Sequence, residues 1–387
     1  MTLRIPLAKP QITDSDREAV AEVLRTPHLS MGPKLAEFEQ AICDYTGSKY
    51  AVAVNSGTSA LQIAVRALNI DPGSEVVVPS FSFSALLNVV LLEKLRPRFV
   101  EIDPETYNLK AHGIATALTE QTRLIIAVHT FGFPLDLGEI GDAVRSYLSR
   151  ARRPRQTVHV VEDACEALGT ETNGGKAGTF GDAGLFAFYP NKQVTTGEGG
   201  VLVTSVRELA SRARILRNQG RDPVLDWYQQ AETGFSYRLS DLNCALGISQ
   251  LQRLEATIAR RQYLAEIYDR ELARIAEIIR PSVTSPVGRI SWFVYPIQLT
   301  AQFTRVHRDR ICESLARKGI ASGRYFSPLH LQPILGSYGI ARPALPQTEF
   351  VADRVMTLPF FNELTQGEIQ EVSGAVEESM RELRLKT

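Results

Sequence analysis

The chain has 387 residues, of which 44% are hydrophobic and 22% are charged, a composition typical of a folded globular protein with room for two domains. Its 43 Lys and Arg residues balance its 43 Asp and Glu residues, so no overall field attracts it to nucleic acid or to an anionic membrane. We therefore expect neither nucleic acid nor a membrane as a partner, and any anionic ligand must be held by local hydrogen-bond donors.

The N-terminus and the cysteines narrow the cellular setting. Residues 1–6 lack the long apolar core and cleavage site of a signal peptide, and no apolar run approaches the length of a membrane span, so we expect a cytoplasmic protein. Cys43, Cys165, Cys244 and Cys312 are widely spaced and form no CxxC pair, which argues against a disulfide framework and a zinc site. We expect four buried, reduced thiols and no bound metal.

The first half of the chain alternates between strand and helix patterns. Continuous apolar runs predict strands at 50–54, 75–78, 98–102, 124–128, 157–161, 184–188 and 200–204, and helical patterns include 59–68, 84–93 and 137–148. Alternation of this kind predicts an α/β fold with a mostly parallel seven-stranded sheet flanked by helices. The last two strands are separated by one short loop, which favours an antiparallel pair.

The second half has a different pattern. Leucines at helical spacing predict one long helix from 241 to 272, which connects the two parts of the chain. Beyond it we expect a strand at 292–297, a helix at 306–318, and a terminal helix at 365–383 with Thr365 as its N-cap. This pattern predicts a large domain of residues 1–254 and a smaller C-terminal α+β domain of residues 255–387.

Lys192 is the most informative single residue. It lies between an apolar strand and a glycine-rich turn, in the segment FYPNKQVTTGEGGV of residues 188–201. A lysine that is partly removed from water and deprotonated can condense with a carbonyl, including the aldehyde of pyridoxal phosphate. The segment therefore suggests a covalent cofactor anchor, with an ordinary loop lysine as the alternative.

Two further segments follow predicted strands. Residues 55–61 (NSGTSAL) open a helix and combine free N–H groups, hydroxyls and the positive end of the helix dipole, which predicts a phosphate-binding turn; a plain N-capped turn is the alternative. Asp163 ends a buried strand, where α/β sheets bind their ligands, and its carboxylate could pair with a protonated pyridine nitrogen. The alternative for Asp163 is a cap of the following helix.

An aromatic residue is a candidate for contact with a flat ligand. Residues 79–85 (PSFSFSA) follow another strand, and Phe83 could stack on a ring. Core packing is the alternative for any single phenylalanine.

In this order, the segments resemble those of the DegT/DnrJ/EryC1/StrS sugar aminotransferases, which are fold-type I pyridoxal-phosphate enzymes. The resemblance runs nearly end to end through 29–33 (LSMGP), 56–61 (SGTSAL), 162–164 (EDA), Lys192 with 195–200 (TTGEGG), 234–241 (GFSYRLSD) and 328–333 (PLHLQP). It implies that Lys192 anchors the cofactor and moves the proton between the substrate carbon and the cofactor.

The resemblance also implies the other cofactor-binding residues. Asp163 would hold the pyridine nitrogen, and Phe83 would cover one face of the ring. The phosphate would be bound by Gly57, Thr58 and Ser59. Glu166 would lie near the cofactor, at a position where many relatives have His or Gln and perosamine-synthase-like members have Glu.

Two residues depart from the family pattern. The family usually has a phosphate-binding Ser five residues before the lysine, where this chain has Ala187. It usually has Asn where this chain has Ser236, in a segment that reaches the phosphate site of a neighbouring subunit. Ala187 removes one donor, whereas Ser236 can still donate from a shorter side chain. At about 1 kcal/mol per hydrogen bond, each change would weaken cofactor binding severalfold without abolishing a covalently anchored site. The resemblance thus implies a homodimer with composite active sites.

The implied reaction is transamination in two halves, from an amino acid such as glutamate to a nucleotide-linked 4-keto-6-deoxy sugar. The TTGEGG segment and Glu166 favour amination at C4; C3-keto sugars, cyclitols, octulosonates and a non-catalytic regulatory protein remain as alternatives. The substrate candidates are Arg324, Tyr325, His330, Arg238 and Arg221. The alternatives are surface or interface salt bridges for the arginines and a packing role for His330.

Overall fold

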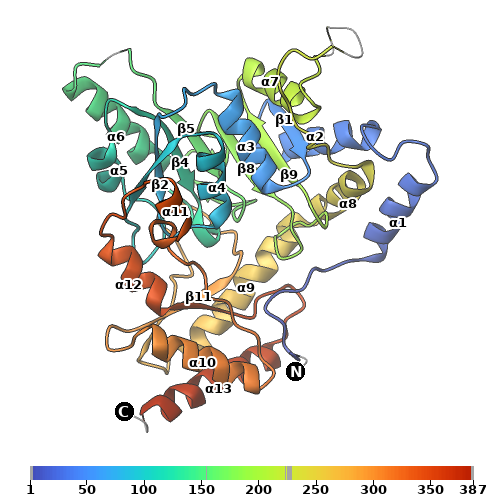
Figure 1. The fold of residues 1–387 in the computed structure, drawn as a ribbon. Coiled ribbons are helices and arrows are strands. Elements are labelled where there is room, and N and C mark those ends of the chain that lie inside the picture. Colours follow the sequence, from blue (N-terminus) through green and yellow to red (C-terminus); the bar gives the residue numbers. More distant parts are fainter. Residues whose placement is uncertain (1–2, 154, 223, 225–228, 385–387) are drawn as a thin grey trace.

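A seven-stranded sheet forms the centre of the larger part of the protein in the computed structural model, which describes residues 3–153, 155–222, 224 and 229–384 (Figure 1). Its strands are β1 (Tyr50–Val54), β2 (Glu75–Pro79), β3 (Arg96–Val100), β4 (Thr122–Val128), β5 (His159–Asp163), β8 (Ala183–Ala187) and β9 (Gly200–Thr204). Their spatial order is β1-β9-β8-β5-β4-β2-β3, and only β9 runs antiparallel to its neighbours. The predicted mostly parallel sheet and the antiparallel pair around Lys192 are confirmed.

The predicted strands differ from the observed ones mainly at their ends. β1 and β9 match the predicted ranges, whereas β3 begins and ends two residues earlier than predicted. β5 runs two residues further than predicted, because Glu162 and Asp163 continue the parallel ladder opposite Ala127 and Val128 of β4. The acidic pair, which suggested the end of the strand, therefore belongs to it.

Helices cover both faces of the sheet, as expected when strand residues alternate between two cores. Val52 and Val54 of β1 pack in the core shared with α3, while Ala51 and Ala53 face the core shared with α2. The helices of this part are α2 (Pro33–Thr46), α3 (Gly57–Ala67), α4 (Ser84–Leu92), α5 (Ala111–Ala117), α6 (Leu137–Arg150), α7 (Arg207–Arg217) and α8 (Asp241–Leu251). Short pieces are the 3₁₀ turn η1 (Thr130–Gly132) and the hairpin of β6 (Glu171–Thr172) and β7 (Gly175–Lys176).

The predicted single helix from 241 to 272 is wrong, because the chain breaks it at residues 252 and 253. α8 ends at Leu251 and α9 runs over Leu254–Leu272. Arg253, at the break, has non-helical φ and ψ of −115° and 13°. Its guanidinium Nη1 donates to Asp16 Oδ1 of α1 (Asp14–Leu24) at 2.8 Å. Asp16 is fully buried, and the hydrogen bonds from Arg253, Thr13 and Ser249 outweigh burial and lower its pKa to about 2.

The smaller part of the protein is an α+β layer, as predicted. Its antiparallel sheet has the order β10-β11-β12. Its elements are β10 (Ile278–Ile279), β11 (Tyr295–Leu299), α10 (Arg305–Arg317), α12 (Pro346–Arg354), β12 (Val355–Leu358) and α13 (Gln366–Arg384). The short pieces η2 (Leu329–Leu331) and α11 (Ile334–Ser337) pack instead on the core of the large sheet through Leu329 and Leu335. Thr365 and Glu368 exchange hydrogen bonds at the start of α13, which confirms the predicted N-cap.

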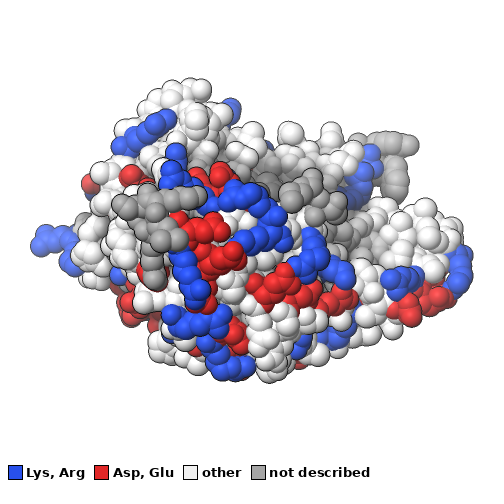
Figure 2. Space-filling view, turned by 90° about the horizontal axis from the view of Figure 1, so that it is seen from below, with Lys and Arg blue, Asp and Glu red and all other residues white. Residues whose placement is uncertain are grey.

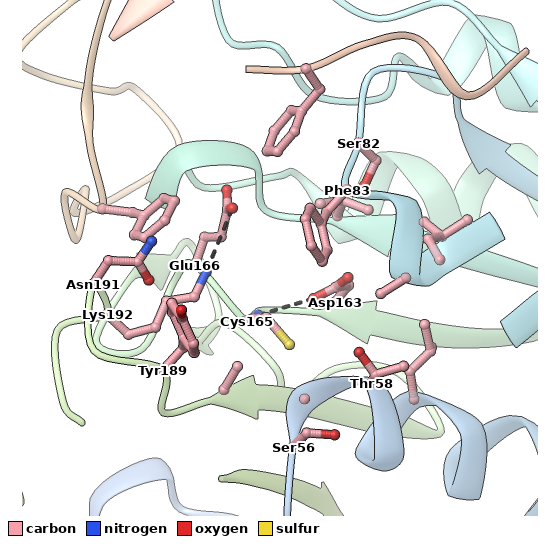
Figure 3. A pocket seen from close by; sticks show the side chains of 18 of the residues that line it. Ser56, Thr58, Ser82, Phe83, Asp163, Cys165, Glu166, Tyr189, Asn191 and Lys192 are labelled. Atoms are coloured by element: carbon pink, nitrogen blue, oxygen red, sulfur yellow. Dashed lines mark hydrogen bonds and ion pairs between the residues drawn. The ribbon is translucent and has the colours of Figure 1, made fainter. Parts of the chain in front are cut away.

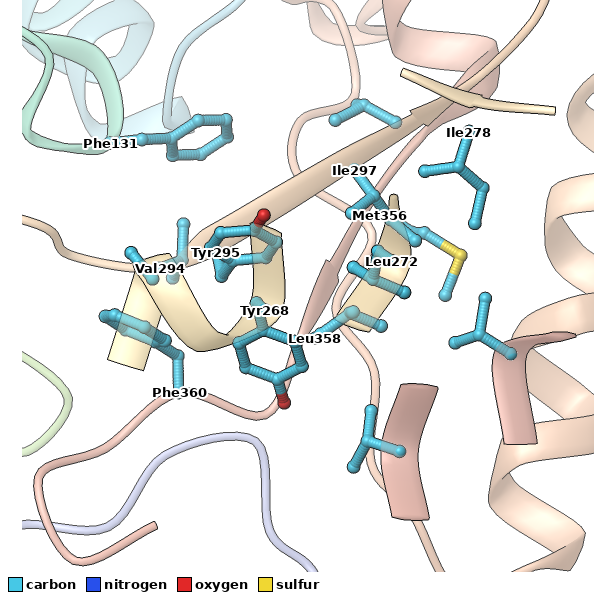
Figure 4. Packing of buried hydrophobic residues seen from close by; sticks show 14 of the residues in the cluster. Phe131, Tyr268, Leu272, Ile278, Val294, Tyr295, Ile297, Met356, Leu358 and Phe360 are labelled. Atoms are coloured by element: carbon cyan, nitrogen blue, oxygen red, sulfur yellow. The ribbon is translucent and has the colours of Figure 1, made fainter. Parts of the chain in front are cut away.

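One apolar core joins the two parts (Figure 4). Tyr268 of α9 stacks on Tyr295 of β11 with ring centroids 4.8 Å apart. The same cluster contains Phe81 and Phe131 from the loops after β2 and β4. The loops at one edge of the large sheet are thereby packed against the smaller part. The predicted boundary after residue 254 coincides with the start of α9 and stays a prediction.

The face of the protein seen in Figure 2 carries no large patch of a single charge sign. Seen from below, basic and acidic side chains are interspersed (Figure 2). In the described ranges no helix is long and apolar enough to cross a membrane, and no group of three or more His, Cys, Asp or Glu residues could hold a metal ion.

All four cysteines are free, but only Cys244 and Cys312 are buried. The expected burial of Cys43 and Cys165 is only partial.

Candidate active site

A cavity of about 420 Å³ lies at the carboxyl ends of the parallel strands (Figure 3). Its floor comes from the last residues of three strands, namely Val128 of β4, Asp163 of β5 and Ala187 of β8. The starts of α3 and α4 and the loop between β8 and β9 form its sides, and Phe293 and Tyr325 close it from the smaller part. This is the edge where open α/β sheets bind their ligands.

Lys192 is held inside this cavity by the hairpin of β8 and β9. The loop is pinned by the N–H groups of Phe188 and Thr196, which donate to Gly199 O and Phe188 O at 2.9 Å. The side chain of Lys192 is only 12% exposed, so the expected removal from water is confirmed. Its Nζ lies 3.6 Å from Glu166 Oε1 and 3.8 Å from the centre of the Phe293 ring. A carboxylate and an aromatic face therefore replace most of its water.

Glu166 is the second enclosed charge of the site. Its Oε2 accepts the Phe131 N–H at 2.9 Å, and its side chain is 13% exposed. Burial raises the pKa of Glu166, and the nearby Asp163 raises it further, while Lys192 and the Phe131 N–H lower it. Its side chain thus faces the Lys192 amine.

Asp163 projects into the cavity from the end of β5 (Figure 3). Its Oδ1 accepts the Cys165 N–H at 3.1 Å within a turn. Because turns rather than a helix follow β5, the alternative that Asp163 caps a helix is wrong. The carboxylate is left facing the ligand space, where it can bind a positively charged ring nitrogen.

A buried pair behind Asp163 was missed by the sequence reasoning. His129 and Glu162 are both fully buried, with His129 Nε2 at 3.1 Å from Glu162 Oε2. His129 Nδ1 accepts the Leu135 N–H, so the ring proton is on Nε2 and donates to Glu162. The Glu162 carboxylate also accepts three N–H groups, from Gly178, Phe180 and Gly181 at 2.6–2.7 Å. A charged residue inside an apolar strand was the signal that could have identified this support.

The predicted phosphate-binding turn lines the cavity only in part. Ser56 caps α3 by accepting the Ser59 N–H at 3.0 Å, so the plain capping interpretation is also correct. The Ser59 hydroxyl donates to Asn55 Oδ1 at 2.7 Å, and the side chain is buried away from the lining. Gly57 and exposed Thr58 do line the cavity. Their N–H groups open the helix and have no partner within it.

Gly57 fits closely against the neighbouring strand end. A Cβ atom built there would lie 2.7 Å from Ala187 Cβ and 3.1 Å from Cys165 Sγ. Ala187 therefore lies beside the start of α3, where the family's serine hydroxyl would meet an anion. Only glycine lets the helix start approach the strand so closely.

Phe83 is 60% exposed and lines the cavity from the start of α4, so the alternative of core packing is wrong for this ring. Phe81, two residues earlier, is fully buried and has the core role instead. Figure 3 shows the Phe83 ring on the cavity wall, on the side of Asp163.

The predicted substrate residues are placed very differently. Tyr325 lines the cavity, and burial raises its pKa. Arg324, next to it, pairs with Asp309 at 3.2 Å and is not in the lining. His330 is fully buried and lies 2.5 Å from Ser80 Oγ and 3.2 Å from Glu349 Oε1, as a packing histidine would.

The segment predicted to serve a neighbouring subunit lies outside the lining of this chain's own cavity. Ser236 is exposed and accepts a hydrogen bond from Arg238 Nη2 at 2.8 Å, and neither residue lines the cavity. Arg221 is half-buried nearby in the chain and is not in the lining either. The sequence reasoning also missed Tyr189, Asn191, Phe293 and Phe326, which do line it.

The described lining fits pyridoxal phosphate. That group needs an amine for its aldehyde, an anion for its ring nitrogen and donors for its phosphate. Lys192, Asp163 and the start of α3 at Gly57 present these groups in one cavity. The close approach at Gly57 leaves backbone N–H groups open to an anion, as helix N-termini in phosphate sites do.

Comparisons with known proteins agree with this chemistry. Residues 10–377 match the model of the DegT/DnrJ/EryC1/StrS aminotransferase family. The chain is 34% identical to the GDP-perosamine synthase of Caulobacter vibrioides over 97% of this chain and 98% of that protein. Spr1654 of Streptococcus pneumoniae, solved in its PLP form, superimposes with a TM-score of 0.91 at 25% identity, covering 98% of this chain and 99% of that one.

A second solved relative is PseC of Helicobacter pylori, an aminotransferase involved in the biosynthesis of pseudoaminic acid. It superimposes with a TM-score of 0.90 at 25% identity, covering 98% of this chain and 99% of its own. The full-length match, together with a lysine and an aspartate in one cavity, establishes the class of enzyme. The chain belongs to the DegT/DnrJ/EryC1/StrS family and is a pyridoxal-phosphate-dependent aminotransferase.

Proposed function

We propose that this enzyme moves an amino group from an amino acid, L-glutamate, to the C4 keto group of a nucleotide-linked keto-deoxy sugar. The observation that carries the proposal is the 34% identity to GDP-perosamine synthase over nearly both whole chains. Glu166, the form found in perosamine-synthase-like relatives, supports the same substrate class.

The proposed cofactor site uses the residues of the cavity. When bound, pyridoxal phosphate supplies an aldehyde that takes up the amino group and a ring that withdraws electrons from the reacting carbon. Lys192 would be its covalent anchor and would carry the proton at the reacting carbon through Nζ. Asp163 would bind the ring nitrogen, Phe83 would cover a ring face, and Glu166 would lie beside the amine.

The phosphate would be held mostly by main-chain groups. The N–H groups of Gly57 and Thr58 and the Thr58 hydroxyl are the donors at the cavity, while Ser59 acts by fixing the turn through Asn55. Ser236 of a neighbouring subunit would complete this set of phosphate-binding donors. Ala187 contributes no hydroxyl.

The proposed sugar site is apolar near the lysine and depends on charges from elsewhere. Tyr325, Phe293 and Phe326 form its wall in the smaller part of the protein. Among the described residues that line the cavity there is no arginine, although a nucleotide diphosphate requires positive charge. Arg324, His330, Arg238 and Arg221 are outside this chain's lining. Arg238 and Arg221 therefore fit better as donors to the site of a second subunit.

Lys192→Ala should lower turnover by about 10³-fold or more, because no other group at this position can transfer the proton. Glutamate-dependent amination is the activity to be measured. Borohydride should fix the cofactor to Lys192 in the natural protein, as seen by peptide mapping, and to no residue in the variant. Lys110→Ala is the matched control, because its ammonium pairs with Asp103 and is half-exposed. Near-normal turnover of Lys192→Ala contradicts the assignment.

The substrate can be identified with a panel of keto-sugar nucleotides that differ in nucleotide and in keto position. We expect amination of a 4-keto-6-deoxy sugar, with the new amine at C4 in the NMR spectrum of the product. The C4 proposal is wrong if the sugar is aminated at C3, or if the enzyme prefers a cyclitol or an octulosonate to the 4-keto sugar. Either result would leave the assignment as an aminotransferase intact.

Ala187→Ser should tighten cofactor binding roughly fivefold, because one added hydrogen bond is worth about 1 kcal/mol. The matched change of opposite sign is Gly57→Ala, whose Cβ would press on Ala187 and force the turn away from the strand. Cofactor dissociation constants of the three proteins, from absorbance titration, test this. Equal constants for all three would exclude a phosphate at this turn.

We further propose a homodimer in which Ser236 serves the partner's site. Lys192→Ala and Ser236→Trp should each inactivate a dimer, but mixed subunits place both changes in one site and leave the other intact. Mixing should therefore restore about one quarter of the natural activity, by random pairing of two subunit types in a two-fold dimer. A mixture no more active than its parents, or an active monomer in sedimentation, contradicts composite sites.

A further inference from the structure

The two oxygens of the Glu166 carboxyl have different partners. Oε2 accepts the Phe131 N–H at 2.9 Å, while Oε1 faces Lys192 Nζ at 3.6 Å. Both side chains are nearly enclosed, with 13% and 12% of their surface exposed. A carboxyl between a fixed donor and an amine is placed to exchange a proton with the amine rather than with bulk water.

Neighbouring main-chain contacts hold Glu166 in this position. Gln193 Nε2 donates to Glu166 O at 2.8 Å and to Ser291 O at 2.9 Å. Phe131, whose N–H binds the carboxyl, has a left-handed φ of 58° that few non-glycine residues adopt. The next residue, Gly132, is pressed against Ser291, since a Cβ there would lie 1.9 Å from Ser291 O. Glu166 is therefore held in place if the charge of Lys192 disappears.

The groups that face Glu166 leave Lys192 as the main source of positive charge. Lys192 is the one basic residue among the described residues of the cavity lining. Asp163, Cys165 and Tyr325 also face this space, and each is neutral or negative. Burial and Asp163 raise the pKa of Glu166, whereas the Lys192 charge and the Phe131 N–H lower it. Loss of the lysine charge removes one of the two groups that lower the pKa of Glu166.

We propose that Glu166 is the proton acceptor of Lys192, and that its carboxyl is protonated whenever the lysine is covalently bound to a carbonyl. As the Lys192 ammonium condenses, two of its hydrogens leave with the carbonyl oxygen as water, and the third passes to Glu166 Oε1. The C=O double bond of the carbonyl is replaced by a C=N double bond, and the positive and negative charges of the pair disappear together. Release of Lys192 reverses the transfer, so neither member of the Lys192–Glu166 pair is left charged without the other.

This role rests on the proposal that Lys192 is the cofactor anchor, which borohydride capture and peptide mapping test on their own. The direct readout is infrared difference spectroscopy of the full chain with and without pyridoxal phosphate. We expect loading to produce a C=O stretching band of a protonated carboxyl, absent in Glu166→Gln and retained, with a frequency shift, in Glu166→Asp. Glu198→Gln, an exposed carboxylate in the same lining, is the matched control and should keep the band.

The proposal is overturned if no such band appears in the natural protein although Lys192 is captured, or if the band survives in Glu166→Gln. A second measurement is the rate of covalent attachment as a function of pH. Glu166→Gln should attach the cofactor about 10²-fold more slowly at neutral pH, with the deficit shrinking at high pH as hydroxide replaces the base. The proposal would also be overturned if Glu166→Gln attached the cofactor at the same rate as the natural protein and with the same dependence on pH.

Discussion

The position of the Lys192 ammonium is the constraint on which the rest of the site depends. Removing an amine from water costs several kcal/mol unless a charge or a π face replaces the water. Glu166 at 3.6 Å and the Phe293 ring at 3.8 Å do so here, and they come from different parts of the chain. Arg261 fixes the second of these by donating to Phe293 O at 3.0 Å. The environment of the amine is therefore complete only when the large sheet and the smaller part pack together.

The topology of the sheet explains why the amine can be held so closely. β8 runs toward the cavity and β9 returns from it, so the loop that carries Lys192 is anchored at both ends. Gly200, the first residue of β9, lies against the turn before α3, since a Cβ there would be 2.3 Å from Ser56 O. A single reversed strand in an otherwise parallel sheet therefore brings the lysine loop and the helix start together. The parallel strands supply Asp163 at the same edge.

The sequence predicted the sheet, the reversed strand and the Lys192 loop, because these follow from apolar runs and loop length, which are local properties. It failed where a distant contact is involved: Arg253, at the helix break, donates to Asp16, 237 residues away. Motif spacing also does not fix side-chain direction. His330 lies in a family-like segment, yet Ser80 and Glu349 bind both of its ring nitrogens inside the core. The ends of β5 were misjudged because four donors make Glu162 acceptable in a buried strand.

The departure from the family pattern at Ala187 makes the proposed phosphate site more dependent on its main chain. Ala187 offers no hydroxyl, and Ser59 has already given its own to Asn55. The Ser56 hydroxyl also lines the cavity, but it is bonded to the hydroxyl and the N–H of Ser59. What remains at the start of α3 is the hydroxyl of Thr58 and N–H groups, whose direction is set by the helix and cannot adjust as a side chain can. Binding there must rely on the exact approach of Gly57 to the strand end. If Lys192 is the covalent anchor, as proposed, the consequence is smaller, because an anchored group returns to a weak phosphate site without leaving the cavity.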